Sequence, residues 1–193
     1  MHNVVWSWIL FYGLHSLLLW PRLQAFLLPI FSGKPRYFRL FYNLLSLLLL
    51  TLAVVMLWRN PGERLWPNTS WTMLLGAMGV LFGGWMGKRA FRSYHLPVFL
   101  GLREEIQMPL NIQGMNRYVR HPLYTASLIL FWSALLVWPT ASFLAVCIIT
   151  SLYVFIGYRL EENRLIRHFG EAYSSYQQQV PALFPRLRQS VDH

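Results

Sequence analysis

The amino-acid sequence predicts an all-α fold, a polytopic membrane bundle of about five transmembrane helices with a helical hairpin near the C-terminus. Of its 193 residues, 55% are apolar and only 12% are charged, about half the charge of a typical soluble domain. The charged residues gather at the ends of long apolar runs, as expected because an ionised group in hydrocarbon is costly. The 9 Trp and 10 Tyr fit the two membrane interfaces, where amphipathic rings are favoured.

A helix that crosses a bilayer needs about 20 apolar residues. Each predicted crossing ends at proline, glycine or a basic residue. The last two are joined by Pro139-Thr140, a link so short that it predicts an antiparallel hairpin. If the first run is re-entrant or lies on the surface, four crossings remain. The predicted crossings are 4–20, which 23–31 extends or follows along the interface, then 37–58, 70–86, 122–138 and 141–158.

The basic residues predict the orientation of these helices. With five crossings and the N-terminus outside, all but Arg59 and Arg64 of the 17 Lys and Arg face the cytoplasm, as the positive-inside rule requires. We therefore expect a single integral membrane domain, 1–193, in a prokaryotic inner membrane, with the C-terminus in the cytoplasm. It divides into the N-terminal spans 1–89, a cytoplasmic connector 90–120, the hairpin 121–158 and a cytoplasmic tail 159–193.

In the third predicted crossing, Gly79, Gly83 and Gly87 recur every four residues. This spacing places them on one helix face, where another backbone can approach closely. Helix packing is the simpler interpretation, and a groove for a lipophilic molecule is the functional one.

Polar residues cluster at the start of the hairpin, from Arg117 to Tyr124. Pro122 is at a position where a helix readily begins. Arg120, His121 and Tyr124 surround this helix N-terminus, which itself favours anionic groups. Each residue alone is typical of an interfacial anchor, whereas the contiguous block predicts a site.

Two adjacent acidic residues, Glu161 and Glu162, follow the hairpin, in a chain with only 7 Asp and Glu. A carboxylate at the mouth of the bundle can accept hydrogen bonds from hydroxyl groups or balance a cation. Adjacent residues point about 100° apart on a helix, so only one need face the site. Arg159 and Arg164 flank the pair.

Tyr173 and Tyr176 share a helix face in the tail, because they are three residues apart. For these tyrosines alone we expect a short amphipathic helix lying on the bilayer, and capping of a ligand is the sharper alternative. The net charge of +10 does not predict nucleic-acid binding, since no basic recognition helix carries it. The histidines have no ligand-like spacing, so no metal site is predicted.

In this order, these elements resemble the isoprenylcysteine carboxyl methyltransferase-like group, which includes phospholipid N-methyltransferases. Asn116 stands where that group usually has an aromatic residue. Three N-terminal segments, His15-Ser16-Leu17, Arg39 to Asn43 and Gly101-Leu102-Arg103, are similar to the branch with methanethiol S-methyltransferases and NnrU-like proteins. The group's signature stands here as Gly114, Arg117, Tyr118, Arg120, His121, Pro122, Tyr124, Glu161, Glu162, Phe169, Gly170, Tyr173, Tyr176, Val180 and Pro181.

The resemblance implies a cytoplasm-facing pocket for S-adenosylmethionine and a small lipophilic acceptor, a thiol, carboxylate or amine, that enters from the bilayer. His121 and Glu161 are the candidate catalytic residues, as proton acceptors for a neutral acceptor. Arg117, Arg159 and Arg164 are candidates to bind the substrate. The implied cofactor contacts are Tyr118, Arg120, His121, Pro122, Tyr124, Glu161 and Glu162.

Two other functions remain open from the sequence. The C-terminal half also looks similar to NADPH-dependent membrane reductases of the sterol-reductase type, although those enzymes are much longer. A non-enzymatic membrane scaffold or transport accessory is the other alternative, and it would bind neither cofactor.

Overall fold

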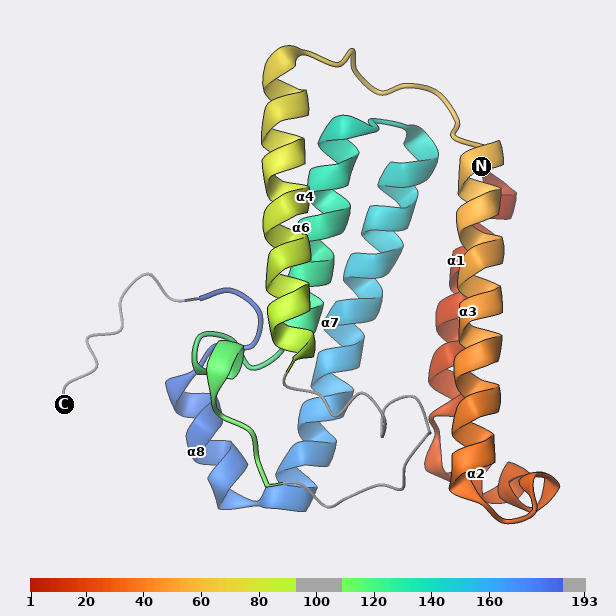
Figure 1. Cartoon of the computed structure of the whole chain (residues 1–193), viewed down its shortest axis with the longest axis vertical. Helices are drawn as coiled ribbons and strands as arrows, with labels where there is room; N and C mark the ends of the chain where they lie inside the picture. Colours follow the sequence, from red (N-terminus) through yellow and green to blue (C-terminus); the bar gives the residue numbers. More distant parts are fainter. Residues whose placement is uncertain (93–108, 186–193) are drawn as a thin grey trace. The chain divides into compact units, whose positions relative to one another are not determined.

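The computed structural model describes residues 1–92 and 109–185. Over these ranges the chain forms helices and connecting turns, with an isolated bridge between Arg64 and Thr140 (Figure 1). The all-α prediction is thereby confirmed for the described part of the chain. Much of the predicted connector, the segment Gly101 to Arg103 and the last eight residues of the tail lie outside it.

The described residues fall into two compact units. The first unit contains residues 1–67 and 138–149, and the second contains 68–92, 109–137 and 150–185. Helix α7, Ala141–Phe169, belongs to the first unit as far as Ile149 and to the second from Thr150 onward.

In the first unit, α1 (His2–Leu18) packs alongside α3 (Pro35–Arg59) (Figure 1). Between them lie α2 (Pro21–Leu27) and the short 3-10 helix η1 (Leu28–Phe31). The chain bends by 75° between α1 and the α2–η1 segment, because Pro21 has no amide hydrogen to continue α1 and forces Trp20 into an extended conformation. The first predicted run is therefore a bent pair of helices.

The second unit begins with α4 (Ser70–Phe91), which a hydrogen bond from the Thr72 amide to the Thr69 side chain caps. It continues with η2 (Gly114–Arg117), α6 (Pro122–Val137), the second part of α7, and α8 (Glu171–Gln179). Helices α4 and α6 run side by side along their length (Figure 1). The Trp132 indole donates to the Ser151 hydroxyl at 3.0 Å, so α6 and α7 form the predicted hairpin.

The glycine face of α4 packs against α6, as the simpler interpretation of the sequence predicted. A Cβ atom on Gly83 would lie 3.1 Å from the Leu130 amide, and one on Gly79 would collide with the Ser133 side chain. Gly76 also belongs to this face, since a Cβ there would lie 2.8 Å from the Ser133 carbonyl oxygen. These glycines allow two backbones to approach closely in a medium where packing drives association.

Two of the described helices, α3 and α7, are long and apolar enough to cross a membrane, and the bent pair at the N-terminus would make a third. This is fewer than the five crossings predicted, which stay a prediction. Helix α7 also continues beyond the predicted end at residue 158, because no proline or glycine follows until Gly170, which has a φ of +59°. Glu161 and Glu162 consequently lie inside a helix.

Candidate active site

The two polar blocks predicted from the sequence meet in the second unit, where Arg120 pairs with Glu162. The Glu162 Oε1 atom lies 2.7 Å from the Arg120 Nε and 2.6 Å from its Nη2. Both side chains are about nine-tenths buried, with exposed fractions of 9% and 10%. Burial of two charges is costly unless they pair closely, so this ion pair is the centre of the cluster.

His121 lies between the two glutamates and two tyrosine rings. Its Nε2 is 3.1 Å from Glu162 Oε1, and its Nδ1 is 3.8 Å from Glu161 Oε2. The rings of Tyr124 and Tyr158 each lie 5.6 Å from the imidazole, centroid to centroid. Because Glu162 is only an acceptor when ionised, the Nε2 atom is the donor in this contact, and the Nδ1 atom faces Glu161.

The two glutamates therefore occupy different environments, although they are adjacent in sequence. Glu162 also accepts from the Tyr173 hydroxyl at 3.4 Å and from the Gln177 amide at 3.1 Å. Side chains of the protein thus already donate to both carboxylate oxygens of Glu162. The Glu161 side chain is 44% exposed, and it is the carboxylate available to a ligand.

The tail after α8 binds the start of α6 through its backbone. The amides of Arg120 and His121 donate to the carbonyls of Pro181 at 2.9 Å and Ala182 at 3.0 Å. The Thr125 hydroxyl donates to the Leu183 carbonyl at 2.7 Å. The amides of Arg120 and His121, just before the first residue of α6, are therefore occupied by tail carbonyls, and the prediction that this helix N-terminus favours anionic groups stays a prediction.

The tyrosine face of α8 packs inside the protein, so the expectation that it lies on the bilayer is wrong. Tyr173 and Tyr176 are 1% and 7% exposed, since their hydroxyls reach Glu162 and the Asn116 carbonyl. Burial raises the pKa of Tyr173 above its usual range, and the Glu162 carboxylate raises it further. Burial also raises the pKa of Tyr176 to about 12, so both stay neutral donors at physiological pH.

The other predicted site residues differ in their burial. Pro122 is the first residue of α6 and is buried. Tyr118, at the end of η2, is 62% exposed. The structure does not gather Arg117, Arg159 and Arg164 into the cluster. All three are exposed, and the Arg159 guanidinium carbon lies 6.0 Å from the Tyr158 ring centroid.

Sequence reasoning missed Gln177 and Tyr158. Gln177 lies four residues after Tyr173 and therefore on the same face of α8. That spacing was a usable signal once Tyr173 had been singled out. Tyr158 lies four residues before Glu162 on α7, which places it beside the glutamate in the same way.

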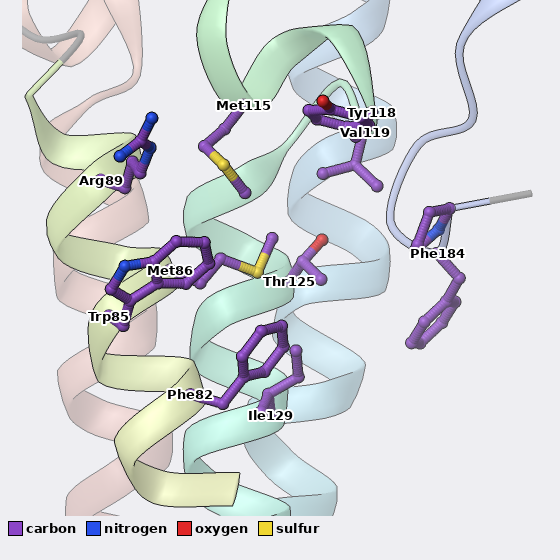
Figure 2. A pocket seen from close by; sticks show the side chains of 11 residues that line it. Phe82, Trp85, Met86, Arg89, Met115, Tyr118, Val119, Thr125, Ile129 and Phe184 are labelled. Carbon is purple, nitrogen blue, oxygen red and sulfur yellow. The ribbon is translucent and has the colours of Figure 1, made fainter.

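A pocket of about 580 Å³ lies beside the cluster in the second unit. Figure 2 shows its lining side chains, which come from α4, from η2 and the segment after it, from α6 and from the tail. Sequence reasoning anticipated a groove beside the glycine face of α4 and had singled out Tyr118 as a cofactor contact. The lining residues are Phe82, Trp85, Met86, Arg89, Met115, Tyr118, Val119, Thr125, Ile129, Phe184 and Pro185.

Fold and site together define a helical membrane protein with a buried Arg–Glu–His cluster at the base of a helical hairpin. Residues 71–172, more than half of the chain, match the model of the phospholipid methyltransferase family. The chain belongs to this family. No solved structure matches it.

Its relatives include methanethiol S-methyltransferases. Methanethiol S-methyltransferase 1 of Bradyrhizobium diazoefficiens is 30% identical over 171 residues, which are 82% of this chain and 58% of the relative. The Crocosphaera subtropica enzyme is 34% identical over 90 residues, 46% of this chain and 34% of the relative. A Pseudomonas enzyme is 42% identical over 78 residues, 39% of this chain and 28% of the relative. The chain thus spans less than two thirds of the length of these relatives.

Proposed function

We propose that this chain is an S-adenosylmethionine-dependent integral membrane methyltransferase whose acceptor is a small lipophilic thiol. The observation that carries the proposal is the partly exposed Glu161 carboxylate, which lies 3.8 Å from the buried imidazole of His121. The chain belongs to a methyltransferase family. The relatives named methanethiol S-methyltransferases favour a thiol over a carboxylate or an amine.

The residues present fit the cofactor chemically. An exposed carboxylate such as Glu161 can accept hydrogen bonds from ribose hydroxyls or balance a sulfonium charge. The exposed Tyr118 ring offers a face on which an adenine can stack, and Tyr124 belongs to the same predicted wall, whereas Arg120 is engaged by Glu162. When bound, S-adenosylmethionine supplies a methyl group on an electrophilic sulfonium sulfur.

In this proposal His121 accepts the proton of the acceptor thiol at Nδ1, because Glu162 keeps Nε2 protonated. Glu161 stabilises the resulting imidazolium, in the way that a carboxylate orients and supports a catalytic histidine. A methyl donor held by Glu161 and Tyr118 would supply its methyl group to the acceptor sulfur, and the electron pair of its carbon–sulfur bond would remain on the donor sulfur. Alignment and exclusion of water supply much of the rate enhancement.

The remaining predictions belong to this proposal. Five crossings in a prokaryotic inner membrane, with the N-terminus outside, place the Arg120–Glu162 cluster at the cytoplasmic surface. The acceptor then arrives from the bilayer and the cofactor from the cytoplasm. Arg117, Arg159 and Arg164 are left as exposed cations that attract anionic substrate groups to this surface.

Calorimetric titration of S-adenosylhomocysteine into the full chain in detergent tests the proposal. We expect saturable binding, weakened about tenfold or more by Glu161→Gln, since a hydrogen bond to a charged group contributes about 1.5–3 kcal/mol. Glu63→Gln, the same change in a loop of the first unit, is the matched control and should bind like the parent. Binding of NADPH instead would support a reductase, and binding of neither would support a scaffold.

A further inference from the structure

The pocket beside the cluster has the form of a slot for an amphiphile. Four of its lining residues, Phe82, Trp85, Met86 and Arg89, stand at positions i, i+3, i+4 and i+7 of α4. They therefore form one stripe along the helix, about 10 Å long at 1.5 Å per residue. Figure 2 shows Arg89 at one end of the lining and Phe82 at the other.

The lining is mainly apolar. Its polar side-chain groups are the Arg89 guanidinium, the Trp85 indole N–H, the Tyr118 hydroxyl and Thr125, whose hydroxyl already donates to Leu183. Arg89 is the one charged side chain in it. Its guanidinium carbon lies 5.9 Å from the Trp85 ring centroid, and no carboxylate pairs with it within residues 1–92 and 109–185. This polarity matches a molecule with a long apolar body and a polar end.

The pocket shares its wall with the cluster. Val119, which lines it, directly precedes Arg120 and packs with Met86 and Ala126. Thr125 lines it one helical turn after His121, and its amide donates to the His121 carbonyl at 3.0 Å. An occupant with its sulfur on the His121 side of this wall would therefore place its apolar body along α4 and α6.

The volume argues against a very small occupant. About 580 Å³ lies within the range of roughly 300–1,000 Å³ that holds drug-sized ligands. Methanethiol, a thiol with one carbon atom, would leave most of this space unfilled.

We propose that this pocket holds the apolar body of the methyl acceptor, so the preferred acceptor is a long-chain thiol and not methanethiol. The inference rests on the proposed function, since it assumes that a thiol is methylated at the neighbouring cluster. Burial of each additional methylene in the pocket strengthens binding by up to about fourfold relative to water.

Binding can be measured without turnover. A 1-octanethiol analogue with a diazirine on its chain is photolysed with the full chain in nanodiscs, without any methyl donor, and the adducts are mapped by mass spectrometry. We expect adducts on Met86, Met115 or Ile129, reduced at least tenfold in Ile129→Trp, which fills the slot. Leu152→Trp, on a 59% exposed position of α7 that does not line the pocket, is the control and should keep them.

Turnover supplies the second readout, the ratio of kcat/KM for 1-octanethiol to that for methanethiol. We expect a ratio of at least ten in the parent and in Leu152→Trp, and at least a tenfold fall in Ile129→Trp. Because all three proteins share the same bilayer, partitioning of the thiol cancels from the comparison. Arg89→Gln should lower kcat/KM for octanethiol several-fold, and the neighbouring Lys88→Gln should not.

The two proposals fail differently. Methylation of methanethiol with no chain-length preference, or adducts confined to other helices, would overturn the acceptor pocket and leave the methyltransferase standing. Adducts in the pocket with no methylation of any thiol would support the pocket and overturn the proposed function.

Discussion

The Glu162 carboxylate binds Arg120 through one oxygen, Oε1, which lies 2.7 Å from Nε and 2.6 Å from Nη2, and 42 residues separate the two in sequence. The same oxygen holds His121 at 3.1 Å. Glu162 therefore joins the start of α6 to α7 and contacts the histidine, whereas the Glu161 side chain stays partly exposed.

Glu162→Gln should destabilise the protein by about 3–5 kcal/mol, because it leaves the buried Arg120 guanidinium without its charge partner. Glu161→Gln should change stability by less than about 0.5 kcal/mol, as expected for a partly exposed side chain without such a role. Unfolding in mixed detergent–SDS micelles, followed by circular dichroism, measures both variants. Equal losses in the two would contradict the division of roles between the glutamates.

Gly76→Ala should cost about 1–3 kcal/mol, because the new methyl group would lie 2.8 Å from the Ser133 carbonyl oxygen and force α4 and α6 apart. Gly84→Ala is the matched control, since a Cβ there meets nothing within 4 Å. It should be neutral or stabilise α4 slightly, because alanine favours helix over glycine. Unfolding in mixed detergent–SDS micelles measures the stability of both variants. Equal changes in the free energy of unfolding at the two positions would argue against close packing of these helices.

Stability should decrease at alkaline pH. The pKa of Tyr176 is raised to about 12, above the value of about 10 expected in the unfolded chain. A raised pKa stabilises the fold fully below pH 10, and the stabilisation from Tyr176 is lost as the pH rises from 10 toward 12, by up to about 1.4 kcal/mol per unit. Tyr173, whose pKa is also raised, adds a decline of its own. Unfolding measured between pH 8 and 11.5 should show this slope, and Tyr176→Phe should be less stable at neutral pH but show a shallower decline. An unchanged slope would assign the alkaline loss to other groups.

The orientation can be tested by cysteine labelling, since Cys147 is buried and is the sole cysteine of the chain. In a Cys147→Ser background, Glu63→Cys should react with an impermeant maleimide in intact cells. Arg164→Cys should react only after permeabilisation, because the positive-inside rule places this helix end in the cytoplasm. The reverse pattern would invert the proposed topology, and labelling of both in intact cells would contradict an outer and an inner side for these positions.

Much of the fold could be predicted from the sequence because the bilayer imposes strong constraints on it. Apolar runs, proline and glycine at their ends and the two-residue link at Pro139-Thr140 predicted helices and a hairpin that the described residues confirm. The number of crossings could not be settled in this way, because α6 is only 16 residues long and the first run bends at Pro21. For such segments, length and composition do not decide whether the helix crosses the bilayer.

The sequence by itself determined which polar residues stand out, since Arg120, His121 and the glutamate pair were visible as polar groups in an apolar chain. Only the tertiary structure decided which of the two glutamates is buried. The packing of α8 against α7 surrounds Glu162 and leaves the Glu161 side chain partly exposed. It also decided that tail carbonyls accept from the amides of Arg120 and His121, just before α6, and that α4 and α6 line a pocket. These contacts depend on the turn at Gly170 between α7 and α8 and on pairings of segments far apart along the chain, and no local periodicity encodes them.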